Sequence, residues 1–124
     1  MNTDFIAVQQ HMTAGEIIGL LKKSHARSEV FYYTYALNSD NKLTGVVSLR
    51  QIILSEPDVP LSEIMHLTVI SVTAQTHIDK VARMFMKYDF RSIPVTDSTG
   101  EMTGIITIKD AFNAVFPEMS VDEE

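Results

Sequence analysis

Two short stretches of the chain place a hydroxyl side chain three residues before a carboxylate or an amide. Residues 45–51 read GVVSLRQ and residues 104–110 read GIITIKD, so the two hydroxyls are Ser48 and Thr107. Such a hydroxyl can cap the helix that follows, and the side chain three residues later can return a hydrogen bond to the cap. A carboxylate at that later position also accepts stronger hydrogen bonds from a ligand than an amide does.

The side chains that usually perform catalysis do not form a recognisable arrangement. We find no Ser-His-Asp order, no nucleophile elbow and no phosphate-binding P-loop. The four histidines do not share a metal-ligand spacing, and the absence of cysteine excludes disulfides and thiolate zinc sites. These observations predict a binding protein and not an enzyme.

The two stretches belong to a longer internal repeat. LTGVVSL at 43–49 matches MTGIITI at 102–108, and a helical apolar pattern at 17–21 matches one at 81–85. The offset is 59 residues for the first pair and 64 for the second, so one copy has five extra residues, which we place around 25–29. Two copies of one unit therefore fill almost the whole chain.

Each unit is predicted to run strand, helix, strand, turn, strand, helix. The expected strands are 5–8, 30–37, 43–49, 69–72, 92–96 and 102–108. The expected helices are 13–23, with Thr13 and Glu16 as a capping box, then 50–55, a helix capped by Thr76 and Asp79 that reaches about residue 88, and 109–117, with a single turn at 61–65. The fold class is α+β, with one domain at 1–60 and a second at 61–124.

The composition is that of a compact soluble domain. Hydrophobic residues make up 45% of the chain and charged residues 21%. No apolar run is long enough to span a membrane, and we predict no membrane insertion by this part of the chain. The net charge of −6 disfavours nucleic-acid binding through a general basic surface, and the lack of cysteine is compatible with the cytoplasm.

The repeat resembles a tandem pair of CBS domains, the module named after cystathionine β-synthase. Both copies carry glycine, two apolar residues, a hydroxyl residue and, three residues later, an acid or amide. The segments YYTYALNSDNKLTGVVSLRQIILSEPDVPLSEIM at 32–65 and VARMFMKYDFRSIPV at 81–95 are similar to the CBS module of MgtE-type magnesium transporters and channels. This resemblance covers residues 4–117 approximately.

The resemblance implies two nucleotide pockets in which the hydroxyl and the acid face a cleft and the acid binds the ribose diol. The residues implied for the first pocket are Tyr33, Ser48, Arg50, Gln51 and Phe90. Those implied for the second are Ile70, Arg91, Ser92, Ile93, Thr107 and Asp110. The two aromatic rings of the first pocket could stack on adenine, or could serve only to pack the sheet. Gln51 departs from the acid of the family, so we expect the pocket with Asp110 to bind ATP or AMP more tightly.

The resemblance also implies regulatory magnesium sites on carboxylates at the faces of the module. The implied ligands are Asp79, Asp89, Asp110 and Asp122, with Glu123 and Glu124 beside the last. Mg²⁺ prefers oxygen ligands and keeps several waters, so isolated or paired carboxylates suffice. The alternative is that Asp79 is a helix cap and Asp89 is a helix-end residue.

Together these features predict a cytoplasmic regulatory module of an MgtE-type transporter, which senses Mg²⁺ and adenine nucleotide to gate ion transport. The resemblance implies a helical domain before the module, a membrane domain after it, and a homodimer that uses the stretches Ile52, Ile53 and Ala111, Phe112. The alternatives are an adenine-nucleotide sensor of another protein and a dimerisation scaffold without ligand.

Overall fold

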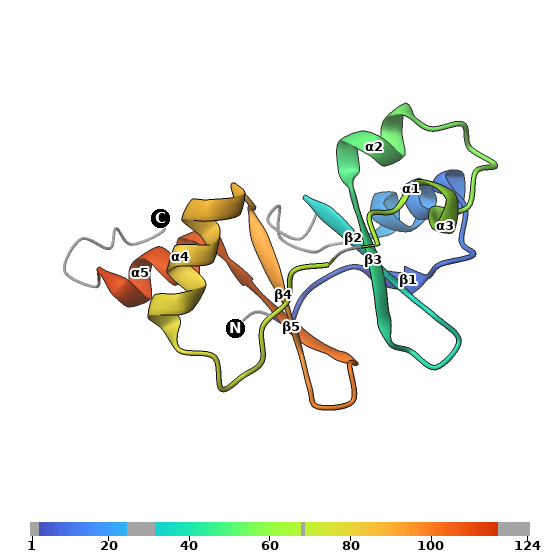
Figure 1. The fold of residues 1–124 in the computed structure, drawn as a ribbon. Coiled ribbons are helices and arrows are strands. Elements are labelled where there is room, and N and C mark those ends of the chain that lie inside the picture. The colour runs from blue at the N-terminus through green and yellow to red at the C-terminus, as the bar shows by residue number, and fades with distance from the viewer. Residues whose placement is uncertain (1–2, 25–31, 68, 117–124) are drawn as a thin grey trace.

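The chain forms two similar halves that lie side by side, each with a small sheet and its own helices (Figure 1). The computed structural model describes residues 3–24, 32–67 and 69–116. The first half contains β1 (Ala7–Gln9), α1 (Ala14–Lys23), β2 (Tyr33–Leu37), β3 (Leu43–Ser48), α2 (Leu49–Leu54) and α3 (Leu61–Ile64). The second contains α4 (Ile78–Tyr88), β4 (Ser92–Thr96), β5 (Met102–Thr107) and α5 (Ile108–Val115). The predicted repeat and the α+β class are confirmed, while the five extra residues around 25–29 lie outside the described residues.

The two sheets differ at their first strand. In the first half β1 pairs parallel with β2, which pairs antiparallel with β3. In the second half β4 and β5 form the antiparallel hairpin, but the strand expected at 69–72 is reduced to one parallel bridge between Val72 and Val95. The expectation of a full strand was therefore wrong.

Proline at position 94 explains the pairing that is missing before Val72. In the first half the Tyr35 N–H donates to the Ile6 carbonyl over 3.0 Å. With the repeat offsets, the corresponding pair in the second half is Pro94 and Ile70, and proline has no N–H to donate. Residues 69–71 therefore stay unpaired and only Val72 forms a bridge. Ile70 faces the space between the halves.

The helix starts follow local capping chemistry. Thr13 forms the predicted capping box with Glu16: the Glu16 N–H donates to Thr13 Oγ1, and the Thr13 N–H donates to Glu16 Oε1. The hydrogen bonds that the Thr13 N–H and the Thr13 hydroxyl donate to the Glu16 carboxylate hold the pKa of this carboxyl below its usual value. At α4 the cap is His77, whose Nδ1 accepts from the Asp79 N–H over 3.1 Å. Thr76, the expected cap, instead accepts from the Thr73 N–H, which corrects the prediction.

Each half has its own apolar core, and a third cluster joins the two. Ile17 and Ile52 are fully buried in the first core, as Ile93 is in the second. Leu61 of α3 is also fully buried in the first core, so α3 packs on the first half. Tyr35 and Ile105 form the joining cluster from one strand of each half. Among the described helices, none has the length and apolar character needed to cross a bilayer.

Candidate ligand-binding cavity between the repeats

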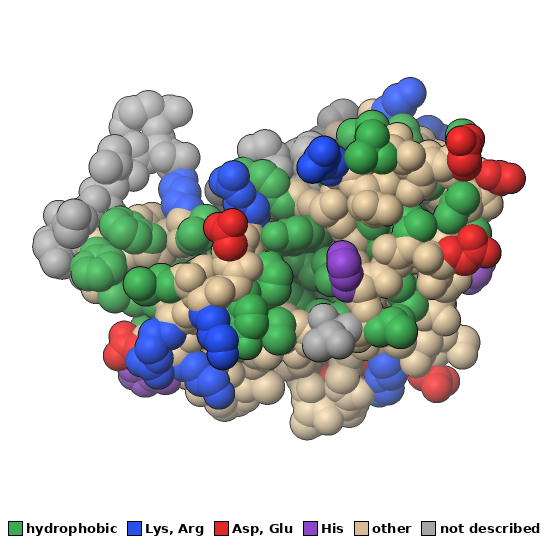
Figure 2. Space-filling model, turned by 45° about the horizontal axis from the view of Figure 1, so that its top comes forward, with side chains coloured by type: hydrophobic (Ala, Val, Ile, Leu, Met, Phe, Trp, Pro, Cys, Tyr) green, Lys and Arg blue, Asp and Glu red, His purple; other side chains and the backbone are tan. Residues whose placement is uncertain are grey.

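A cavity of about 590 Å³ lies where the two halves meet. It opens in the middle of the face shown in Figure 2, where hydrophobic side chains line a hollow. Its lining residues come from β2, β3, β4, the segment after α3 and the turn after α4: Tyr33, Tyr35, Val46, Ser48, Met65, His66, Leu67, Val69, Ile70, Phe90, Ser92 and Pro94. The volume is that of an ordinary small-molecule site.

The first repeat supplies one wall through the pairing of β2 and β3. Tyr33 and Tyr35 are two residues apart on β2, so both side chains point to the same face of the sheet. The register places Tyr33 opposite Ser48 and Tyr35 opposite Val46. The Ser48 hydroxyl also accepts from the Gln51 N–H over 3.1 Å, so it caps α2 at the edge of the cavity.

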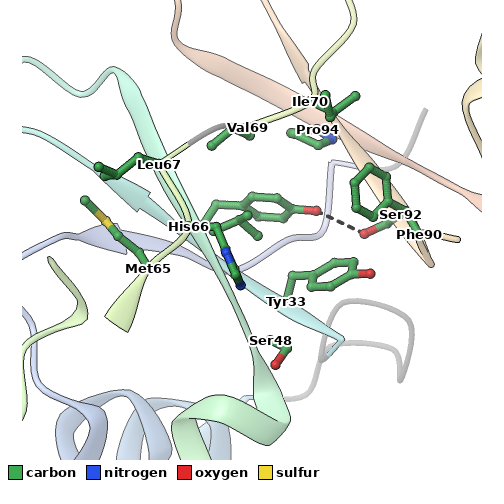
Figure 3. Close-up of a pocket in the computed structure, with 12 residues that line it drawn as sticks. Tyr33, Ser48, Met65, His66, Leu67, Val69, Ile70, Phe90, Ser92 and Pro94 are labelled. Atoms are coloured by element: carbon green, nitrogen blue, oxygen red, sulfur yellow. Dashed lines mark hydrogen bonds between the residues drawn. The ribbon is translucent and has the colours of Figure 1, made fainter. Parts of the chain in front are cut away.

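The second repeat supplies the opposite wall. Phe90 enters after Asp89, which ends α4 in the left-handed conformation with φ 56°. On β4, Ser92 and Pro94 face the cavity, whereas Ile93 between them is buried in the core of the second half. Figure 3 shows Tyr33 and Phe90 pointing into the same space from the two halves.

A buried hydrogen bond fixes the floor of the cavity. The hydroxyls of Tyr35 and Ser92 lie 3.0 Å apart, and both residues are almost completely buried (Figure 3). Burial raises the pKa of the Tyr35 hydroxyl, and the hydrogen bond with Ser92 offsets a part of that rise. Tyr35 is therefore neutral at physiological pH and holds the two strands at a fixed separation.

Arg91 lies beside the aromatic residues of the first repeat. Its backbone N–H donates to the Tyr33 hydroxyl over 3.2 Å, and its guanidinium lies 5.3 Å from the centre of the Tyr32 ring. The sequence assigned Arg91 to the second pocket. The structure places it next to Tyr33, which belongs to the first.

The segment between the halves forms the remaining side. His66 pairs with Val46 through two backbone hydrogen bonds of 3.2 and 2.9 Å, which extends the sheet over the cavity. Its imidazole projects toward the same space as the two aromatic rings in Figure 3. Leu67 is 73% exposed although it lines the rim.

The lining suits a flat and largely apolar ligand group. The described residues of the lining offer aromatic and aliphatic side chains with the hydroxyls of Ser48 and Ser92 and the imidazole of His66, and none of these described residues is a lysine, arginine, aspartate or glutamate. We therefore expect a charged part of a ligand to extend out of the cavity. The exposed residues Arg50 and Arg91 lie within two residues of the lining residues Ser48 and Phe90 in the sequence. This arrangement can bind and orient a molecule.

The other predicted nucleotide residues lie outside the lining. Arg50 and Gln51 are exposed in the first turn of α2. Thr107 is buried opposite Ser92 and caps α5, and Asp110 is exposed on that helix. Within the described residues neither Gln51 nor Asp110 returns a side-chain hydrogen bond to its cap, so both side chains stay available. Their roles in nucleotide binding remain predictions.

The predicted metal ligands are dispersed. Among the described residues, no three histidines or carboxylates come close enough to hold a metal ion. Asp79 lies 3.6 Å from His77 Nδ1 at the start of α4, and Asp89 is the C-cap at the opposite end of the same helix. Asp89 lies at the helix end and His77, not Asp79, caps the helix, while the magnesium roles of Asp79 and Asp89 stay predictions. Asp122 lies outside the described residues, as do Glu123 and Glu124.

Several lining residues escaped the sequence prediction. Tyr35 and Val46 could have been found, because strand periodicity places Tyr35 beside Tyr33 and the hairpin pairing brings Val46 opposite. His66 and Leu67 carry no local signal, since their position depends on how the segment between the repeats crosses the sheet. Ile70 and Ser92 were assigned to the second pocket but line the same cavity as Tyr33 and Phe90.

Comparisons with known proteins agree with the repeat. The model of the CBS domain family matches residues 1–57 and again residues 61–117. The magnesium transporters MgtE of Thermus thermophilus and Bacillus subtilis are 34% and 33% identical over 98% and 100% of this chain. The chain spans 27% and 28% of those relatives. A crystal structure of the cytosolic domain of the Mg²⁺ channel MgtE in complex with ATP is 34% identical, with a TM-score of 0.86 over 90% of this chain and 45% of that one.

Proposed function

The chain belongs to the CBS domain family, and on that premise we propose that it is a non-catalytic regulatory module that binds an adenine nucleotide in the cavity between its repeats. The parent protein would be a magnesium transporter of the MgtE type, because the similarity to those proteins extends over nearly the whole chain. The module itself would lie in the cytoplasm, and the helical and membrane domains of the parent would be its neighbours.

The observation that supports the nucleotide most strongly is the meeting of Tyr33 and Phe90 across one cavity. These are two of the positions that the resemblance implies for an adenine site, and they come from different repeats. A purine between such rings gains stacking energy, and the Ser48 hydroxyl at the edge can reach a ribose. The phosphates would extend to Arg50 and Arg91, which lie outside the apolar lining.

Calorimetric titration with ATP and AMP tests this assignment. Stacking on an aromatic side chain is worth about 1–3 kcal/mol per base, so Tyr33→Ala and Phe90→Ala should each weaken ATP roughly 5- to 150-fold. Phe116→Ala is the matched control, because Phe116 is 43% exposed at the end of α5 and does not line the cavity. Equal ATP affinity in all four proteins would refute the site.

The magnesium role is proposed for Asp79, Asp89, Asp110 and Asp122. Since the described carboxylates do not form a cluster, we expect weak binding that strengthens when the neighbouring domains supply further ligands. Specific binding stabilises the module by RT ln(1 + [L]/Kd), on the order of 1 kcal/mol at a few times Kd. The melting temperature in MgCl₂ should be higher than the melting temperature in NaCl of equal ionic strength. A shift that NaCl reproduces in full would exclude a specific site in this module.

A further inference from the structure

A second hollow runs along α4, on the other side of the segment that lines the nucleotide cavity. It has a volume of about 670 Å³ and shares Val69 and Ile70 with that cavity. The lining residues are Val69, Ile70, Ser71, Val72, Thr76, Lys80, Arg83, Met84, Lys87 and Tyr88. We call this hollow the α4 groove. A group of basic side chains lies over the half that contains α4 in Figure 2.

Three cations line one edge of the α4 groove. Lys80, Arg83 and Lys87 are exposed and follow one another at three and four residues, so they form one stripe along the helix. Within the described residues none of them has a carboxylate in ion-pair distance. Asp79 of the same helix turns instead toward His77. The stripe stands out because the whole chain carries a net charge of −6.

The opposite edge and the floor of the groove are mainly aliphatic. The ring of Tyr88 stacks on Phe90 at 5.5 Å with an angle of 16°, and the Lys87 ammonium lies 5.1 Å from its centre. A base that stacked on Tyr88 would therefore compete with Phe90 and Lys87 for the ring. A nucleotide fits this groove poorly, whereas a ligand with aliphatic groups beside regularly spaced negative charges fits well.

We propose that the α4 groove docks an acidic helical segment of a protein partner. A helix rises about 1.5 Å per residue, so glutamates three and four residues apart repeat at the same intervals as Lys80, Arg83 and Lys87. Small aliphatic residues between those glutamates would lie against the partly exposed Val69, Ile70 and Met84. The charges steer the segment and fix its register, and the aliphatic contacts hold it. This proposal does not depend on nucleotide binding in the neighbouring cavity.

The test uses an alanine-based helical peptide with three glutamates at the spacing of the three cations. Fluorescence anisotropy should show saturable binding to the 124-residue chain, which weakens with salt because the charges are exposed. The same peptide with glutamine in place of glutamate should not bind. Arg83→Glu should reduce the affinity on the order of tenfold, and Lys87→Gln should reduce it less.

Lys22→Glu is the matched control, since it makes the same change of charge at the exposed end of α1. This variant should keep the peptide affinity within about twofold of wild type, apart from the effect of the changed net charge. Thermal melting of each variant checks folding. Equal loss in Arg83→Glu and Lys22→Glu would show a general charge effect and overturn the proposal. Binding of inorganic tripolyphosphate with no binding of the peptide would also overturn it, because the groove would then be a small-anion site.

Discussion

The hydroxyl of Tyr35 on β2 and the hydroxyl of Ser92 on β4 lie 3.0 Å apart, 57 residues apart in sequence, and together join the two repeats inside the molecule. The exposed fractions of the two residues are 2% and 4%, so water does not compete for this hydrogen bond. The bond also forms the floor of the cavity between the repeats. The same contact thus contributes to the stability of the pair of repeats and to the shape of the cavity.

Tyr35→Phe should lower the free energy of unfolding by about 1–3 kcal/mol, because the Ser92 hydroxyl is left buried without its partner. Urea unfolding measures the change. The control is Tyr32→Phe, which should lie within about 0.5 kcal/mol of wild type, since Tyr32 is 40% exposed. The double variant Tyr35→Phe with Ser92→Ala should be less destabilised than the sum of the single changes. Strict additivity would show that the two hydroxyls do not interact.

Stability should also fall at alkaline pH because of Tyr35. Burial raises the pKa of this hydroxyl in the folded chain, while an unfolded tyrosine ionises near pH 10. Above about pH 10 the unfolded chain therefore loses a proton that the folded chain keeps, and each further pH unit favours unfolding until the folded pKa is reached. Denaturant unfolding between pH 9 and pH 11 should show that the free energy of unfolding falls more steeply with pH in wild type than in Tyr35→Phe. Equal slopes would contradict this.

The repeat made most of the fold predictable from sequence. The pattern GVVSLRQ and GIITIKD fixes two hairpins and the helices that follow them, and the spacing of Thr13 and Glu16 fixes the start of α1. Helices and hairpins depend on residues close in the chain, so local patterns find them. The assignment of Tyr33 and Phe90 to one site came instead from the resemblance to the CBS module of MgtE-type transporters.

The predictions that were wrong or missing concern features that depend on contacts between the repeats or on a single unusual residue. Pro94 lacks the N–H that would pair with Ile70, so only Val72 of the expected strand 69–72 forms a bridge. His77 caps α4 through its imidazole, a role that the usual capping residues did not suggest. His66 reaches the cavity because the chain crosses the sheet after α3, and no local pattern encodes that path.

Gly45→Ala should destabilise the protein and disturb the cavity. A Cβ at Gly45 would lie 2.5 Å from Sδ and 3.0 Å from Cβ of Met65, so this side chain has to move. We expect a loss of about 1–3 kcal/mol and weaker ATP binding, since Met65 lines the cavity. Gly19→Ala is the matched change: it meets no atom within 4 Å inside α1 and should stabilise by about 0.5–1 kcal/mol. Calorimetric melting that ranks the two in the opposite order would refute the packing argument.

Homodimer formation is predicted to use exposed apolar residues of α2 and α5. Of the residues first proposed, Ile52 and Ala111 are buried in their own cores, with exposed fractions of 0% and 2%, so they cannot supply this surface. Ile53 and Phe112 are 61% and 45% exposed and can. Light scattering should give about twice 13.9 kDa for wild type and a monomer for Ile53→Glu. Met86→Glu, at a residue that is 86% exposed on α4, should leave the dimer intact.

The last prediction concerns the residues that follow the two hydroxyl caps. Gln51 follows Ser48 at the rim of the cavity, whereas Asp110 follows Thr107, and neither Thr107 nor Asp110 lines the cavity. If a ribose diol lies near Ser48, Gln51→Asp should raise ATP affinity, because a carboxylate accepts the two hydroxyls more strongly than an amide does.

Asp110→Asn separates the two predicted pockets. A lost hydrogen bond to a charged group costs about 1.5–3 kcal/mol, so nucleotide bound beside Thr107 should weaken roughly 10- to 150-fold in this variant. Nucleotide bound between Tyr33 and Phe90 should keep its affinity. Calorimetry with ATP and AMP on wild type and the two variants decides between the pockets. A loss of affinity in Asp110→Asn with no gain of affinity in Gln51→Asp assigns the nucleotide to the second pocket, as the sequence predicts. A gain in Gln51→Asp with no loss in Asp110→Asn assigns it to the cavity between the repeats, and the ranking of the pockets by their acid is then wrong.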